Sequence, residues 1–336
     1  MRMGEDKQIR RILKERVMVL DGAMGSLIRN YDLTEEDFRG DMFAGSGKDQ
    51  KDNFEALNLT RPEIIKEIHT SYLKAGADII ETNTFNGSEI SLADWGLEEY
   101  AFEINKTAAR LAREAVTEFS QKSGRACFVA GVLGPTNKSV SLSPGIDHLG
   151  FRTIRFDDLV LACKQQGEAL MEGGADLLMI ETVFNILNAK AALLAVEEVF
   201  DKLGRSLPLM VSVTITDTGG RIRSGQNIEA FPNSISLTHL LSIGINCAPG
   251  ARGMKPFLRE LSEKAPFFVS AHPNAGMPNP VGEYDQTPER MSKEIKGFLD
   301  EKLVNIIGGC CGTTPDHIFR FAELAAKAEA RQVPVT

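Results

Sequence analysis

The sequence predicts a single (β/α)8 barrel that spans residues 1–336. Short apolar runs alternate with amphipathic helical patterns along the chain, which is typical of repeated strand–helix units around a parallel sheet. A Gly-Ala-Asp phrase precedes an apolar run and a Glu-Thr pair at 76–82, and the same arrangement returns at 174–182. A chain of 336 residues lies within the usual size of such a barrel. Eight strands are predicted, near residues 17, 79, 128, 177, 209, 243, 267 and 304.

The first part of the chain departs most from a regular repeat. A charged helical pattern over 1–16 precedes the first strand, which ends at Asp21. Residues 21–60 are irregular and polar, and the segment is too long for an ordinary connection. We interpret it as an insertion that forms a lid over the barrel mouth. A helix over 60–75 then leads to the second strand.

The later strands are separated by helical patterns of ordinary length. Helices are predicted over 97–120, 156–172 and 186–202. Between 247 and 310 the chain holds one further strand with a helix on each side of it. Residues 330–336 are predicted to form a C-terminal tail or linker.

A doubly wound open sheet is the alternative arrangement of the same elements. That fold usually carries Gly-x-Gly-x-x-Gly after its first strand, so that the backbone can approach the pyrophosphate of a dinucleotide. The sequence at this position is Asp21-Gly22-Ala23-Met24-Gly25, which lacks the pattern. A nucleotide is therefore not expected there.

Composition and charge exclude several classes of function. Apolar residues make up 43% of the chain and charged residues 25%, as in an ordinary globular protein. The net charge of -8 disfavours a nucleic acid or an anionic membrane as a partner. Neither a signal peptide nor a membrane span is evident, so a cytoplasmic protein is expected. Five cysteines are too few for a disulfide framework, and we expect Cys127 and Cys163 to be core residues.

The other three cysteines stand at predicted strand ends. Cys247 ends the sixth strand, and the adjacent Cys310 and Cys311 follow the eighth. Alternate strands of a barrel can face each other across its mouth, so these thiols are expected to converge. Three thiolates without an obvious fourth protein ligand indicate zinc with an open position. Because such a zinc is electron-rich, it suits a reaction whose substrate is itself a thiol.

Polar side chains at the other strand ends complete the predicted site. Asp21, Glu81, Glu181 and Asn274 are expected at the mouth, and the three carboxylates suit a cationic amine. Each has a structural alternative: the two glutamates could cap a helix or pair with an arginine, and Asp21 could shape a turn. His272 is expected to be a hydrogen-bonded structural residue.

The chain resembles the zinc-dependent homocysteine methyltransferases. It is most similar to the N-terminal homocysteine-binding barrel of cobalamin-dependent methionine synthases. The motif Gly308-Gly309-Cys310-Cys311-Gly312 is the most specific part of this resemblance. The likeness covers nearly the whole chain and is carried by residues 19–22, 38–40, 81–85, 131–137, 244–247, 271–276 and 308–312.

The resemblance implies a set of roles. Zinc is bound by Cys247, Cys310 and Cys311. The sulfur of L-homocysteine takes the open position, Asp21 and Glu181 hold its ammonium group, and Asn274 approaches the metal when substrate is absent. The methyl donor is methylcobalamin carried on a corrinoid module or subunit, and the family's complete enzyme also has a folate-binding module. The chain then resembles an excised module or one subunit of a split enzyme.

Three alternatives to this function stay open at the level of sequence. Relatives with the same zinc chemistry use S-methylmethionine, S-adenosylmethionine or betaine as the donor. A barrel hydrolase could use Glu81 and Glu181 as an acid and a base, but it leaves the three cysteines without a role. The third alternative is a non-catalytic module that binds zinc or substrate.

Overall fold

The barrel predicted from the sequence is confirmed. The computed structural model describes residues 3–138, 140, 154–215, 239–279 and 284–334. Eight parallel strands pair in the order β1-β8-β7-β6-β5-β4-β3-β2, and a bridge from Leu20 to Ile79 joins the two ends of this sheet. The strands are β1 (Met18–Val19), β2 (Ile79–Glu81), β3 (Phe128–Leu133), β4 (Leu177–Val183), β5 (Leu209–Val213), β6 (Leu240–Cys247), β7 (Phe268–Pro273) and β8 (Ile306–Ile307).

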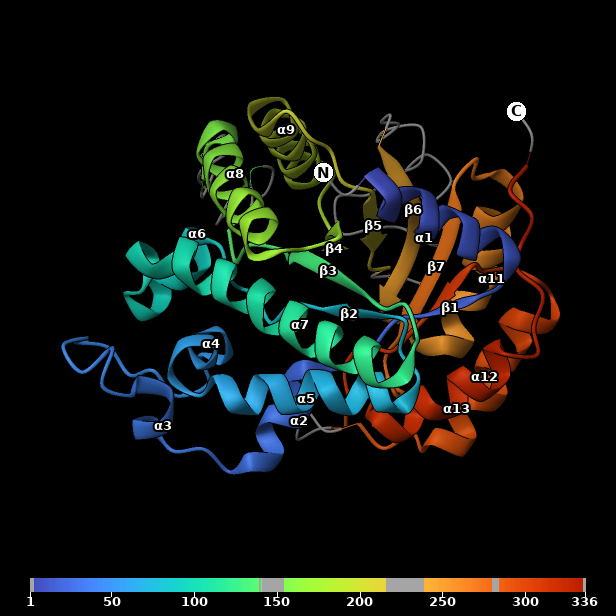
Figure 1. Ribbon diagram of the computed structural model, residues 1–336, viewed down its shortest axis with the longest axis horizontal. Coiled ribbons are helices and arrows are strands. Elements are labelled where there is room, and N and C mark those ends of the chain that lie inside the picture. Colours follow the sequence, from blue (N-terminus) through green and yellow to red (C-terminus); the bar gives the residue numbers. More distant parts are fainter. Residues whose placement is uncertain (1–2, 139, 141–153, 216–238, 280–283, 335–336) are drawn as a thin grey trace, which may run out of the picture.

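Helices run round the outside of the strands (Figure 1). The main ones are α5 (Pro62–Ala75), α7 (Ala101–Ser123), α8 (Phe156–Gly173), α9 (Ile186–Leu203), α11 (Gly250–Lys264), α12 (Pro288–Asp300) and α13 (Pro315–Ala325). The helix predicted over 97–120 begins later than expected, because Gly96 adopts a left-handed conformation and residues 98–100 form a separate 3-10 turn. Within the described ranges, the structure contains no helix that is both long enough and apolar enough to cross a membrane.

Side chains alternate between the inside of the barrel and its helical coat. In β4, Leu177 and Met179 belong to the interior cluster, whereas Leu178 and Ile180 pack against the helices. This period of two is the pleat of a strand, and its continuation turns Glu181 inward at the end of β4. The N-terminal helix α1 (Met3–Glu15) places Ile9 and Leu13 in the same interior cluster. The barrel is therefore packed at the end where α1 lies, and its polar groups gather at the carboxyl ends of the strands.

The insertion after β1 is more regular than the sequence suggested. It contains α2 (Met24–Ile28), α3 (Glu35–Arg39) and α4 (Leu57–Thr60), joined by polar loops. Phe43 packs with Leu97 and neighbouring apolar residues in a small core outside the barrel. The Asn83 side chain, just after β2, donates to the Phe54 carbonyl at 2.8 Å, so the insertion also contacts the rim of the mouth. Closure over the mouth as a lid stays a prediction.

The close approach of β6 and β7 depends on Gly244. It pairs in register with Ser270, and a Cβ added at Gly244 would collide with the backbone of that residue. We expect Gly244→Ala to lower the free energy of unfolding by about 1–3 kcal/mol, the usual cost of overpacking. Chemical denaturation measures this change. Gly167→Ala in α8 is the matched control: its added Cβ meets only Val199, at 3.7 Å, and a gain of about 0.5–1 kcal/mol is expected. Equal stabilities for the two variants would contradict the packing argument.

Candidate metal and substrate site

Three thiols converge at the mouth of the barrel. Cys247 is the last residue of β6, and Cys310 and Cys311 lie in the loop after β8. The sulfur atoms of Cys247 and Cys310 are 2.8 Å apart, and those of Cys310 and Cys311 are 3.9 Å apart. Both separations exceed a disulfide bond of about 2.05 Å, and the cysteines are free. All three sulfur atoms lie within 4.8 Å of one another, which makes them a candidate metal site.

Backbone hydrogen bonds tie the three cysteine loops together. The Cys310 amide donates to the Pro273 carbonyl at 2.9 Å, and the Asn274 amide donates to the Cys247 carbonyl at 3.1 Å. The Ala275 amide donates to the Cys311 carbonyl at 2.9 Å. The loop after β7 therefore fixes the positions of cysteines that come from β6 and β8. This rigidity matters because a metal site needs its ligands held in place before the ion binds.

The turn at the cysteine pair requires a glycine after it. Gly312 has a φ of +78°, in the left-handed region that side chains disfavour, and an added Cβ would collide with Tyr284. The hydroxyl of Thr313 donates to the Cys310 carbonyl at 2.6 Å and accepts from the Ala23 amide at 3.1 Å. The Gly-Cys-Cys-Gly-Thr sequence thus closes the loop against the segment that follows β1.

The thiol cluster favours a negative charge on one sulfur. Hydrogen bonds from Cys247 and Cys310, together with one from Tyr284, lower the pKa of Cys311 to about 3. The hydrogen bonds of Cys310 to Cys247 and Cys311 raise its pKa above the usual value. A thiolate surrounded by two further sulfur donors is the donor set that zinc prefers. The residues present therefore fit a zinc ion.

Carboxylates form a second cluster inside the barrel. Oxygen atoms of Glu81 and Glu181 and a ring nitrogen of His272 lie within 4.8 Å of one another. Burial and the neighbouring acids raise the pKa of Glu81, and burial followed by the charge of Cys311 raises that of Glu181 to about 8. Asp21 is also buried, and its pKa is raised by burial. One Asp21 oxygen accepts from the Glu81 amide at 3.1 Å, whereas the other has no hydrogen-bond partner among the described residues.

Asn246 connects the carboxylate cluster to the cysteines. Its side-chain amide donates to Glu181 at 3.2 Å and to the Thr182 hydroxyl at 2.7 Å, and its oxygen accepts from Ser212 at 3.0 Å. Asn246 directly precedes Cys247 on β6, so one strand supplies a thiol and the residue that orients a carboxylate. This role of Asn246 was not predicted from the sequence, although the period of two along β6 places its side chain on the inner face of the strand.

The structural alternatives for the two glutamates find little support. The helix after β4 is capped by Asn185, whose side chain accepts from the amides of Leu187 and Asn188. Across the described ranges, no ion pair joins Glu81 or Glu181 to an arginine. Both carboxylates instead point into the interior with His272. Such crowding of acids inside the barrel is typical of a site that receives a cation.

His272 departs from the arrangement expected from the sequence, whereas nothing observed at Asn274 contradicts its expected role. Both ring nitrogens of His272 lack hydrogen-bond partners among the described residues, so it is not the hydrogen-bonded structural residue that we expected. Asn274 is buried, and its side-chain oxygen is likewise without a partner in the described part of the chain. A buried acceptor without a donor is a free ligand atom, consistent with the role expected for Asn274.

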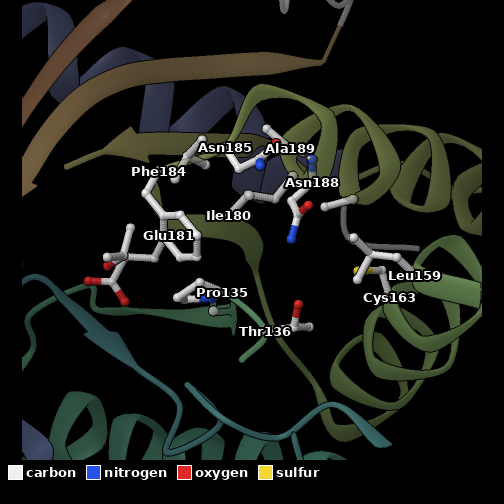
Figure 2. Close-up of a pocket in the computed structure, with 14 residues that line it drawn as sticks. Pro135, Thr136, Leu159, Cys163, Ile180, Glu181, Phe184, Asn185, Asn188 and Ala189 are labelled. Carbon is white, nitrogen blue, oxygen red and sulfur yellow. Dashed lines mark hydrogen bonds between the residues drawn. The ribbon is translucent and has the colours of Figure 1, made fainter. Parts of the chain in front are cut away.

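A small apolar cavity borders the carboxylate cluster. Figure 2 shows Glu181 and Phe184 at one end of it and Leu159 and Cys163 at the other. Its walls come from α8, α9 and the carboxyl ends of β3 and β4. Cys163 is buried here, apart from the three clustered thiols, as expected for a core residue. Cys127 is buried as well.

Comparison with known proteins identifies the family. The model of the homocysteine S-methyltransferase family matches residues 18–325. The chain belongs to this family. Homocysteine S-methyltransferases are methyl-transferring enzymes, so the chain is a methyltransferase, and the hydrolase alternative falls away.

Solved structures of one bacterial protein share the barrel of this chain. The metallated form of the homocysteine methyltransferase MmuM from Escherichia coli aligns with a TM-score of 0.70 and 22% identity, covering 94% of this chain and 97% of the other. Its oxidised form aligns with a TM-score of 0.71 and the same identity, covering 92% and 96%. At this level of identity the likeness shows the fold.

Proposed function

We propose that this chain transfers a methyl group to the thiol of L-homocysteine, forming L-methionine, with zinc bound by Cys247, Cys310 and Cys311. The observation that carries the proposal is the convergence of these three thiols at the barrel mouth, beside a pocket of buried carboxylates. The family of the chain makes homocysteine the natural thiol for such a site. Metal and amine subsites a short distance apart fit an amino acid whose thiol and ammonium are joined by a short carbon chain.

Each group of residues has a distinct task in this proposal. When bound at these residues, zinc would lower the pKa of the incoming thiol, so that the sulfur would be a thiolate that is still nucleophilic. Cys247, Cys310 and Cys311 would hold the ion and leave room for the substrate sulfur, and Asn274 has an unpaired side-chain oxygen in the loop that binds the backbone of the cysteines. Asp21, Glu81 and Glu181 surround the substrate ammonium, and its positive charge offsets the repulsion among the three carboxylates.

The methyl donor in this proposal is methylcobalamin carried on a separate module or subunit. Because α1 packs into one end of the barrel, the donor is expected to approach the opposite end, where the cysteines lie. A folate-binding module would then remethylate the corrinoid. This arrangement treats residues 1–336 as one homocysteine-binding barrel that acts with partners.

An assay with different methyl donors tests whether methylcobalamin is the donor. We expect slow methylation of homocysteine by free methylcobalamin at high concentration, because a donor that is not tethered lacks a high effective concentration. Methionine formation is measured by chromatography for methylcobalamin, S-methylmethionine, S-adenosylmethionine and betaine. Efficient use of one of the last three, with no reaction from methylcobalamin, would replace the proposed donor. Failure of all four donors on zinc-loaded protein would favour a non-catalytic binding module.

A further inference from the structure

His272 is a buried histidine with no described function. Its side chain is 0% exposed, and neither ring nitrogen has a hydrogen-bond partner among the described residues. A buried polar group without a partner costs about 1–3 kcal/mol, so an unpartnered buried histidine that also lies beside candidate ligand residues is itself a candidate ligand. The ring nitrogen Nδ1 lies 3.9 Å from a carboxylate oxygen of Glu181, too far for a hydrogen bond between them.

The strand period explains why His272 faces this pocket. Phe268 on β7 belongs to the interior cluster, and two steps of two residues lead from it to His272. His272 also pairs in register with Asn246 of β6, whose side chain reaches Glu181. The histidine, the asparagine and the carboxylate therefore meet inside the barrel.

From this geometry we propose that His272 is a specificity-determining residue: with Glu81 and Glu181 it forms a tripod of acceptors that selects a primary ammonium group. The inference rests on the proposed function, since it assigns the amine subsite of that reaction. A primary ammonium has three N–H donors, and one acceptor on each of the three side chains satisfies all of them.

The spacing of the tripod suits an ammonium. Hydrogen bonds of about 2.8 Å at a tetrahedral angle of about 109° place the acceptors about 4.6 Å apart. The acceptor atoms of Glu81, Glu181 and His272 all lie within 4.8 Å of one another. A secondary or tertiary ammonium would leave at least one of these three acceptors unpaired.

The charge of the imidazole also suits this role. The ring is fully buried, and the neutral form of an imidazole has one nitrogen with a lone pair that can accept a hydrogen bond. A neutral acceptor adds a hydrogen bond without adding a fourth negative charge to the pocket of Asp21, Glu81 and Glu181. A protonated histidine would instead repel the ammonium.

Calorimetric titration of the zinc-loaded protein without a methyl donor tests the tripod. The ligands are L-homocysteine, N-methylhomocysteine and 4-mercaptobutanoate, which has the thiol and the carboxylate but no ammonium. We expect His272→Leu to weaken homocysteine binding about tenfold or more, to leave 4-mercaptobutanoate binding unchanged, and to reduce the preference for homocysteine over its N-methyl derivative. His272→Asn keeps an acceptor and is expected to retain most of that preference.

His69 provides a matched control. It is also fully buried, and its two ring nitrogens also lack partners in the described part of the chain. It lies on α5 and belongs to neither candidate ligand cluster. His69→Leu is expected to bind all three ligands like the parent protein, and thermal unfolding compares the stabilities of the variants.

The outcomes separate the inference from the function on which it rests. If the parent protein binds homocysteine and 4-mercaptobutanoate equally well, the proposal that these residues bind the substrate ammonium is itself wrong. If the parent discriminates between them and His272→Leu discriminates to the same degree, the tripod alone is overturned. Electron paramagnetic resonance with Mn2+, which avoids thiolates, provides the remaining check: Mn2+ binding that competes with homocysteine and disappears in His272→Leu would make the cluster a metal site and overturn the inference.

Discussion

Replacing Cys311 with serine is expected to remove both zinc and activity while the barrel still folds. The variant keeps two sulfur donors, and a zinc site that loses one of three thiolates loses most of its affinity. The three sulfur atoms lie within 4.8 Å of one another, so each is close enough to share one ion. We expect about one zinc per chain in the parent protein and at least a hundredfold weaker binding in the variant, since even outer contacts to a metal site change affinity 10- to 100-fold.

Metal analysis and circular dichroism measure occupancy and folding on the same samples. Cys127→Ser is the matched control, because Cys127 is buried near β3 and lies outside the cluster. The control is expected to keep its zinc and its methyl-transfer activity. Full zinc occupancy in purified Cys311→Ser would show that the three cysteines are not the ligand set.

The sequence predicted the barrel and the strand ends because both depend on local patterns. Apolar runs, the repeated Gly-Ala-Asp phrase and the caps of the helices fix where strands begin and end. The carboxyl ends of parallel strands must then lie at one end of the barrel, which brought Cys247 and Cys310 together in the prediction. The period of two along β2 and β4 also determines that Glu81 and Glu181 face inward.

Other features of the site depend on contacts that no local pattern encodes. The role of Asn246 arises because β4, β5 and β6 place Glu181, Ser212 and Asn246 within hydrogen-bond distance. The ring nitrogens of His272 have no hydrogen-bond partners among the described residues. This cannot be read from the sequence, because it depends on which side chains surround the ring in the folded barrel. The short helices of the insertion could not be predicted from local patterns, because they are stabilised by a small core that they share with residues after β2.

Glu181→Gln is expected to weaken homocysteine binding while leaving zinc in place. The substitution removes a charge that faces the substrate ammonium but keeps the shape of the side chain and an acceptor for Asn246. Loss of one charge-assisted hydrogen bond costs roughly 1.5–3 kcal/mol, which corresponds to about a tenfold to hundredfold rise in the dissociation constant. Titration of zinc-loaded protein with homocysteine measures this, and 4-mercaptobutanoate is the control ligand because it has no ammonium to lose.

The effect of Glu181→Gln is also expected to depend on pH. Burial, followed by the charge of Cys311, raises the pKa of Glu181 to about 8, so the carboxyl is mostly protonated at pH 6 and must ionise to pair with an ammonium. Each pH unit below that pKa costs about 1.4 kcal/mol, or about tenfold in apparent affinity. The parent protein therefore gains affinity from this group as the pH rises from 6 to 8, and the glutamine variant does not. The dissociation constant of the variant divided by that of the parent protein should therefore increase from pH 6 to pH 8. Ionisation of the substrate thiol cancels in this ratio because it affects both proteins alike. A ratio that stays constant from pH 6 to pH 8 would place Glu181 outside the ammonium subsite.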